Sequence, residues 1–259
     1  MKKIMITFPH ADDVTINLGG LVRQWSNAGH EVYLVRITDD DADCAGIPTR
    51  EEAIRINREE AEQAYSIIGA KKVIHLGYTS DTFGGIDFLG LREKIIKLLR
   101  QIKPNTSITF AMDGREEENM DHRITAYAVA EAHWTASFDL HHPEQFKGGL
   151  KPFCVGERLY FARVPEDNYG IFDVTDVMDT KIKAILSHKT VMKNYALQLK
   201  MRAQVLGLDT SFFNNNEQDV IIEKYMRKRF SGKDIPGSYE AIERLHNPSA
   251  GLDLLKYFK

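Results

Sequence analysis

The fold is decided by residues 3–38, which read KIMITFPHADDVTINLGGLVRQWSNAGHEVYLVRIT. The first six of these residues form a mostly apolar run with β-branched side chains, as expected of a parallel strand buried on both faces. Residues 15–28 place apolar side chains at helical spacing, and Gly29 is a suitable end for that helix. Residues 31–37 then form a second strand. A strand, a helix and a second strand in this order predict a right-handed crossover between parallel neighbours.

The alternation of helices and strands continues along the first half of the chain. Further helices are predicted at 49–68, 88–102 and 122–137, with strands at 72–76 and 107–111. This order predicts an α/β protein with a Rossmann-like, mostly parallel sheet and helices on both faces. After Pro143 we expect short strands at 157–163 and 170–174, a helix at 176–206, a loop at 209–217 and a last helix at 218–229. We therefore expect one domain over residues 1–259, with a core at 1–140 and a C-terminal extension of helices and strands at 141–259.

The composition is that of an ordinary soluble enzyme, with 43% hydrophobic and 27% charged residues and a net charge of -3 over 259 residues. A nucleic-acid partner normally requires a basic face, and the basic run KYMRKRF at 224–230 is interpreted as a solvated helix face. No apolar run reaches the roughly 18 residues of a membrane span, and the N-terminus lacks a signal-peptide core. Cys44 and Cys154 make neither a disulfide framework nor a Cys-rich metal site. We expect a cytoplasmic protein that binds neither nucleic acid nor a membrane, and we leave a homo-oligomer open.

The first candidate site is the segment His10-Ala11-Asp12-Asp13, directly after the first strand. In doubly wound sheets, reactive groups gather at the carboxyl ends of strands. His10 and Asp13 lie across a turn, so both can bind one ion, and imidazole with carboxylate suits zinc. Asp12 lies between them and is suited to act as general base in metal-assisted hydrolysis. The alternative is that Asp12 and Asp13 cap the following helix and that His10 is an ordinary polar residue.

The second candidate site is Asn119-Met120-Asp121-His122, which follows the fourth predicted strand. If the first and fourth strands are neighbours, His122 becomes a third ligand and leaves a fourth position for water, as catalytic zinc sites do. Asp121 would then accept a hydrogen bond that fixes an imidazole ring. The alternative for Asp121 is a helix N-cap.

The turn after the first strand excludes a dinucleotide cofactor. Such a site requires G-x-G-x-x-G at this point, where the chain has no glycine and two acidic residues, Asp12 and Asp13. These carboxylates would repel a pyrophosphate. The pair Gly19-Gly20 comes too late, inside the predicted helix.

Together these segments resemble the LmbE/PIG-L family of zinc-dependent de-N-acetylases. PHADD followed by Gly19-Gly20 resembles the His-Pro-Asp-Asp-Glu…Gly-Gly opening of the family, and NMDH at 119–122 resembles its His-x-Asp-His segment. Further similarities in chain order are REEAEQAYSIIGA at 58–70, HLGYTSD at 75–81 and DVTDVMDTKIKAILSH at 173–188. The resemblance covers about residues 3–190.

The resemblance implies that His10, Asp13 and His122 bind zinc and that Asp12 is the base. It also implies that Arg58 contacts hydroxyl or phosphate groups of the substrate, although a solvated helix residue is an equal alternative at that position.

The chain departs from the family at several positions. Asn119 stands where the family has a histidine that steadies the oxyanion, and Val14 stands where it has a glutamate. The Asn119 amide can still donate a hydrogen bond, and His188 is the second candidate for that role. Thr190 and Val191 replace the Ser-Gln that usually follows this histidine. The departures are compatible with a divergent substrate or weaker catalysis.

The predicted function is removal of an N-acetyl group from an amino sugar of the N-acetylglucosamine type, or from a related small amine. The alternatives are an amidase for a bulkier N-acyl or thiol conjugate, a non-catalytic sugar-binding module that kept the pocket, and a metal-free α/β protein. Acidic residues at 39–41 and 116–118 are expected at the rim of the site. They would favour a neutral or cationic ligand over a phosphate, unless they form merely a solvated loop.

Overall fold

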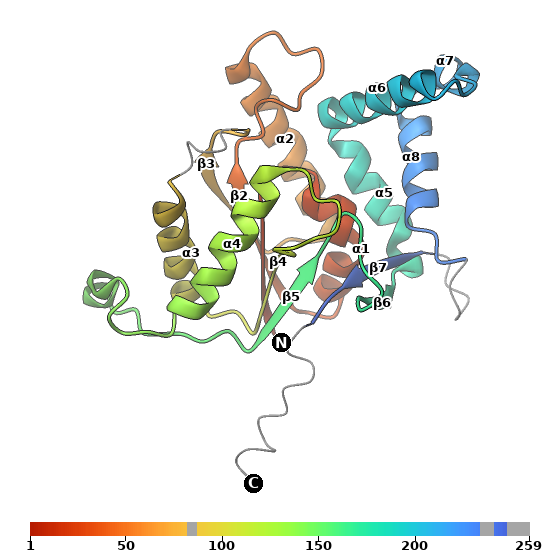
Figure 1. The fold of residues 1–259 in the computed structure, drawn as a ribbon. Coiled ribbons are helices and arrows are strands. Elements are labelled where there is room, and N and C mark those ends of the chain that lie inside the picture. Colours follow the sequence, from red (N-terminus) through yellow and green to blue (C-terminus); the bar gives the residue numbers. More distant parts are fainter. Residues whose placement is uncertain (82–86, 234–240, 248–259) are drawn as a thin grey trace.

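Figure 1 shows the computed structural model, which describes residues 1–81, 87–233 and 241–247. At its centre lies a five-stranded sheet of order β3-β2-β1-β4-β5, in which all neighbouring strands are parallel. The predicted α/β class with a Rossmann-like sheet is thereby confirmed. The strands are β1 (Lys3–Phe8), β2 (Glu31–Thr38), β3 (Lys72–Tyr78), β4 (Thr106–Phe110) and β5 (Glu157–Phe161).

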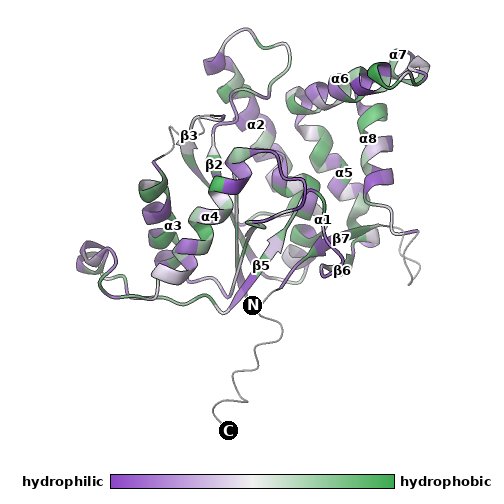
Figure 2. Cartoon of the chain, viewed as in Figure 1, coloured by the Kyte–Doolittle hydropathy of each residue, from purple (hydrophilic) through white to green (hydrophobic). Residues whose placement is uncertain are grey.

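Helices cover both faces of the sheet, as predicted (Figure 1). The helices α1 (Asp13–Asn27), α2 (Arg50–Ile68) and α5 (Met178–Ser187) pack on one another over one face. The helices α3 (Phe88–Ile102) and α4 (Met120–Thr135) pack together over the other. Hydrophilic and hydrophobic residues alternate around α3 and α5 in Figure 2, as expected of helices with one buried face. Each face of the sheet therefore has its own apolar core.

Local signals explain where α2 begins and ends. The Thr49 hydroxyl accepts a hydrogen bond from the Glu52 backbone N–H at 3.2 Å, so Thr49 is the N-cap of this helix. Gly69 ends the helix with φ 85°, a left-handed conformation that favours glycine.

The C-terminal part of the chain differs from the prediction in three places. The helix expected at 176–206 is broken at His188 into α5 and α6 (Lys189–Val205). The loop expected at 209–217 contains a short helix, α7 (Ser211–Asn215), which leads into α8 (Gln218–Arg229). A last strand, β7 (Ile242–Leu245), was not predicted, and it pairs antiparallel with β6 (Gly170–Asp173). Short 3-10 helices lie at Pro143–Gly148 and Thr175–Val177, and β5 extends the main sheet beyond residue 140.

A buried ion pair attaches this C-terminal part to α1. The Lys181 ammonium lies 2.7 Å from the Glu243 carboxylate, and both side chains are fully buried. Glu243 also accepts hydrogen bonds from the backbone N–H groups of Gly20 and Leu21, both at 2.8 Å. A Cβ on Gly20 would lie 2.7 Å from Val174, so glycine permits this close packing. Helix α1 carries Asp13 in its first turn, so the same contacts hold the C-terminal part against a candidate site helix.

Among the residues that the structure describes, no helix combines the length and the apolar character needed to cross a membrane.

Candidate active site

The two candidate segments meet at the carboxyl edge of the sheet. His10 follows β1, and Asp13 opens α1. His122 lies in the first turn of α4, whose N-cap is Asn119. Because β1 and β4 are adjacent and parallel, the loops that follow them lie side by side. The expected neighbourhood of the first and fourth strands is confirmed.

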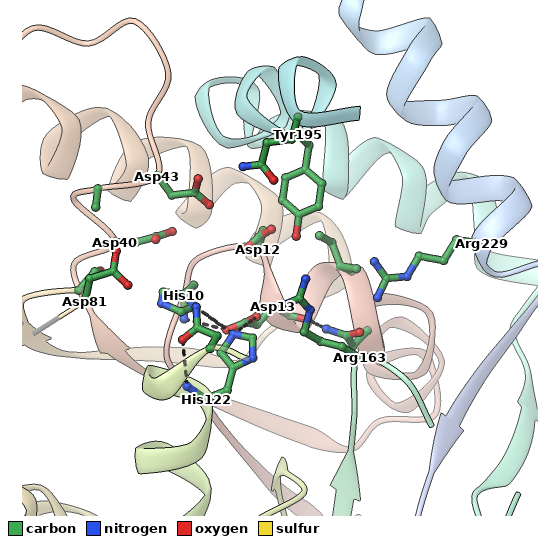
Figure 3. A pocket seen from close by; sticks show the side chains of 16 residues that line it. His10, Asp12, Asp13, Asp40, Asp43, Asp81, His122, Arg163, Tyr195 and Arg229 are labelled. Atoms are coloured by element: carbon green, nitrogen blue, oxygen red, sulfur yellow. Dashed lines mark hydrogen bonds and ion pairs between the residues drawn. The ribbon is translucent and has the colours of Figure 1, made fainter. Parts of the chain in front are cut away.

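The three predicted metal ligands form one cluster (Figure 3). His10 Nδ1 lies 3.1 Å from His122 Nε2, and His122 Nε2 lies 3.3 Å from Asp13 Oδ1. The second Asp13 oxygen lies 3.6 Å from His10 Nδ1. One ligand atom from each residue lies within 4.8 Å of the others, so the three can converge on one ion. Two imidazoles and a carboxylate are a donor set that suits zinc.

Carboxylates orient both imidazole rings from behind. Asp121 Oδ2 lies 3.1 Å from His10 Nε2, and Glu117 Oε2 lies 2.9 Å from His122 Nδ1. Burial lowers the pKa of His10, but the hydrogen bond to Asp121 and the charge of Asp13 outweigh it and raise that pKa to about 10. The carboxylates therefore give the cluster a strongly negative electrostatic potential, which stabilises a positive charge between the ligands. Asp121 is not the N-cap of α4, because that role belongs to Asn119.

Asp12 is the predicted base, and it is buried at the wall of a cavity of about 270 Å³. Its Oδ2 has no hydrogen-bond partner among the described residues. Burial and then the charges of Asp13 and Asp40 raise the pKa of Asp12 well above its ordinary value. A carboxylate with a free, desolvated oxygen next to a metal-ligand cluster is suited to exchange protons with a substrate.

The other predicted residues lie at different distances from this cavity. Asn119 lines it, but the Asn119 Oδ1 atom accepts the backbone N–H groups of Asp121 and His122. His188 is fully buried behind the site, with Nε2 3.1 Å from the Thr15 hydroxyl. Arg58 is half exposed and paired with an aspartate outside the cavity lining.

Several side chains at the cavity wall belong to none of the motifs. The Tyr195 hydroxyl on α6 points towards Asp12 (Figure 3). Arg229 at the end of α8 and Arg163 after β5 lie on the same side of the cavity. The basic run 224–230, interpreted from the sequence as a solvated helix face, contains Arg229, and the side chain of Arg229 instead lines the cavity. Tyr195 and Arg163 have no sequence signal, because both come from the part of the chain where the strand–helix alternation is lost.

The rim is less acidic than the sequence suggests. Asp39 pairs with Arg58 at 2.9 Å and Asp41 pairs with Arg50 at 3.0 Å. Glu117 is buried against the candidate metal site and does not face the solvent. Of the two acidic segments only Asp40 lines the cavity, where Asp43 and Asp81 lie beside it, so the acidic character is confined to one wall (Figure 3).

Comparisons with known proteins show which proteins the chain resembles. The family model described as PIG-L, GlcNAc-PI de-N-acetylase, matches residues 5–133. The diacetylchitobiose deacetylase of Thermococcus kodakarensis is 25% identical over 194 residues, which are 73% of this chain and 70% of that protein. The residues matched by the family model include His10, Asp12, Asp13 and His122.

Solved structures share the fold. The N,N'-diacetylchitobiose deacetylase of Pyrococcus horikoshii gives a TM-score of 0.73 at 23% identity, over 94% of this chain and 83% of that one. GalB, the 4-carboxy-2-hydroxymuconate hydratase of Pseudomonas putida, gives a TM-score of 0.65 at 19% identity, over 96% of each chain. Since a hydratase has the same architecture, the reaction has to be argued from the side chains at the site.

Proposed function

Because the chain belongs to the PIG-L family of de-N-acetylases, we propose that it is a zinc-dependent hydrolase that removes the acetyl group from an N-acetylated amino sugar. One observation carries this proposal. The His10, Asp13 and His122 cluster lies beside Asp12, and the free carboxylate oxygen of Asp12 borders the same cavity. This arrangement provides a metal site and a proton acceptor within one pocket.

The metal would be held by His10, Asp13 and His122, and their donor atoms fit this role. Asp121 is hydrogen-bonded to the far nitrogen of His10, and the Glu117 carboxylate lies 2.9 Å from the far nitrogen of His122, which is the support expected of metal-binding histidines. When bound, zinc supplies a Lewis acid for the acetamide carbonyl and lowers the pKa of water at the site to about 7.

Asp12 moves the proton in this mechanism. Its Oδ2 atom takes a proton from the attacking water, whose oxygen forms a bond to the carbonyl carbon. As the carbon–nitrogen bond breaks, Asp12 returns the proton to the amine nitrogen, and the products are the free amine and acetic acid, which releases its remaining proton to become acetate at neutral pH. The raised pKa of Asp12, caused by burial and by the charge of Asp13, makes the carboxylate a stronger proton acceptor in the first of these steps.

Two cavity groups are placed to stabilise the developing negative charge on the carbonyl oxygen. The Tyr195 hydroxyl lines the cavity and points towards Asp12 (Figure 3). The Asn119 oxygen is bound to backbone N–H groups, so its NH₂ group is the part that can donate to a substrate.

His188 acts through its neighbours and not on the substrate. Burial lowers its pKa to about 3, so the ring is neutral. The Thr15 hydroxyl that it contacts donates to the Asp12 backbone carbonyl at 2.8 Å. We therefore assign His188 a positioning role behind Asp12.

The test is acetate release from a panel of N-acetylated amino sugars, with bulkier N-acyl analogues beside them. The wild-type protein, loaded with zinc, is expected to release acetate, and Asp12→Asn should retain zinc while kcat falls by about 10²–10⁴-fold. Asp167→Asn, an exposed aspartate, is the matched control. Activity of Asp12→Asn within a few-fold of wild type contradicts the assignment of the base, and faster cleavage of bulky acyl groups favours the amidase alternative.

A further inference from the structure

The loop between β1 and α1 carries most of the candidate metal site. It contains His10 and Asp12, and Asp13 follows at the start of α1. Residues 9–13 are all buried, so their backbone N–H and C=O groups need partners inside the protein. The positions of these partners therefore decide where the side chains of the loop point.

Three buried hydroxyl groups donate hydrogen bonds to the carbonyl groups of this loop. The pairs are Thr38 to Pro9 at 2.8 Å, Tyr65 to Ala11 at 2.7 Å, and Thr15 to Asp12 at 2.8 Å. The three donors lie on β2, α2 and α1, and none of them is more than 1% exposed. Three separate elements of the fold thus hold the loop through its backbone.

The Ala11 carbonyl depends on its hydroxyl donor more than the other two carbonyls do. The Pro9 carbonyl also accepts from the Thr38 backbone N–H at 3.1 Å, and the Asp12 carbonyl also accepts from a backbone N–H of α1 at 2.9 Å. In the part of the chain that the structure describes, the Ala11 carbonyl has the Tyr65 hydroxyl as its only donor. Loss of that hydroxyl would leave a buried carbonyl without a partner.

Helix α2 also supports the other peptide group of Ala11. The Ala11 N–H donates to Asp40 Oδ2 at 3.0 Å, and the same oxygen accepts from the Asn57 amide at 3.1 Å. Asn57 and Tyr65 lie about two turns apart on α2. One face of this helix therefore holds Ala11 through both of its peptide groups.

The Tyr65 ring is itself fixed by packing. It is fully buried and lies edge-on to Phe8, with ring centroids 5.9 Å apart, and to His188 at 6.2 Å. Burial raises the pKa of Tyr65, so the hydroxyl keeps its proton and remains a donor. A phenylalanine at this position would keep both ring contacts and remove only the hydrogen bond to Ala11.

We propose that Tyr65 is a positioning residue of the metal site. Its hydroxyl holds the Ala11 carbonyl, and Ala11 lies between His10 and Asp12 in the chain. The bond therefore fixes the first ligand and the base relative to Asp13, so that the ligands are already arranged for an ion before it binds. The inference rests on the proposed function and adds a residue of α2 to the groups that determine metal affinity.

Zinc affinity tests this inference. With the full chain and a competing fluorescent chelator, the dissociation constant of zinc should rise by about tenfold or more in Tyr65→Phe, which is the usual effect of losing a group that supports metal ligands. In the metal-free protein, backbone hydrogen exchange over residues 9–13 should become faster by a similar factor, because the loop opens more often. Tyr33→Phe removes a hydroxyl that donates to Glu31 at 3.0 Å on the same sheet, and it should change neither quantity.

Two further variants test the assignment to the Ala11 carbonyl. Thr38→Val should raise the zinc dissociation constant less than Tyr65→Phe does, because the Pro9 carbonyl keeps the Thr38 backbone N–H as a donor. Asn57→Ala frees Asp40 and should raise the dissociation constant, which tests the support from α2 if Tyr65→Phe does not fold.

The outcomes separate this inference from the deacetylase function. If zinc binds but no N-acetylated sugar releases acetate, the deacetylase proposal fails, and the zinc dissociation constants still test Tyr65. If the wild type binds no zinc, the proposed function fails, and hydrogen exchange still shows whether Tyr65 holds the loop. A Tyr65→Phe protein that melts at a lower temperature, but keeps the zinc affinity and the exchange rate of wild type within a few-fold, overturns the positioning role. So does an equal effect of Tyr33→Phe.

Discussion

Replacement of the buried carboxylate that attaches the C-terminal part to α1, as Glu243→Gln, should destabilise the protein strongly. The substitution keeps the shape of the side chain and removes its charge. The Lys181 ammonium then stays fully buried without a counter-ion, and one of the two α1 backbone N–H groups loses its acceptor. Loss of one partner of a buried pair costs about 3–5 kcal/mol. For a chain of this size the melting temperature should fall by roughly 10 °C.

The double variant Lys181→Met/Glu243→Gln separates the charge from the packing. Methionine fills a similar volume and leaves no buried ammonium. The double variant should therefore lose only about 1–3 kcal/mol of unfolding free energy, which is the cost of the unsatisfied backbone N–H. Urea unfolding of the wild type, both single variants and the double variant completes the cycle.

The dependence on pH gives a second check on the Glu243→Gln variant. Burial lowers the pKa of Lys181, and loss of Glu243 removes the charge that opposes this shift. The unfolded chain then holds more protons than the folded one, so the stability of Glu243→Gln should rise between about pH 7 and pH 9.5 relative to wild type. The reasoning is refuted if Glu243→Gln loses less than about 1 kcal/mol in free energy of unfolding, or if its difference from wild type does not change with pH.

Three further predictions concern separate parts of the molecule. Tyr195→Phe should lower kcat by about 10–100-fold with little change in KM, because the hydroxyl is assigned to the oxyanion; a change in KM alone contradicts this role. Burial lowers the pKa of both His133 and His188 to about 3, so stability should be lost as the pH falls below 6.5, by about 1.4 kcal/mol for each at pH 5.5. Urea titrations of the wild type and of His133→Gln and His188→Gln at pH 7 and 5.5 measure this loss, and a difference between variant and wild type that does not change with pH refutes it. Gly20→Ala should cost about 1–3 kcal/mol by calorimetry, because its Cβ would lie 2.7 Å from Val174; an unchanged melting temperature contradicts it.

The parallel sheet could be predicted because its signals are local. Strands β1 to β4 are short apolar runs, and the helices between them carry their own caps, such as Thr49 and Gly69. The boundaries of the predicted elements therefore lie within a few residues of the observed ones.

The C-terminal part could not be predicted in the same way, because tertiary contacts decide it. Apolar residues continue at helical spacing through His188, yet the chain turns there, where the ring packs against Thr15 and Tyr65. Strand β7 has four residues, and its Glu243 bonds to α1 more than 200 positions away in the sequence. Neither contact leaves a periodic signal.

The residues of the candidate site also fall into those that the sequence could predict and those that it could not. His10, Asp13 and His122 follow strand ends, so the topology that the sequence predicts also brings them together. Tyr195 and Arg229 reach the cavity from α6 and α8, and only the packing of those helices places them there. Sequence reasoning thus predicted the ligand cluster, Asp12 and Asn119, but it missed Tyr195 and Arg229 at the cavity wall.

Bound zinc, measured together with acetate release, tests the central claim most directly. The account predicts that the wild-type protein, loaded with zinc and dialysed, retains one equivalent by elemental analysis and releases acetate from an N-acetylated amino sugar. His10→Ala and His122→Ala should each lose both properties, while His30→Ala, a partly exposed histidine away from the site, should keep both. Wild-type protein that holds no metal, or that releases acetate at an unchanged rate after chelation, contradicts the account.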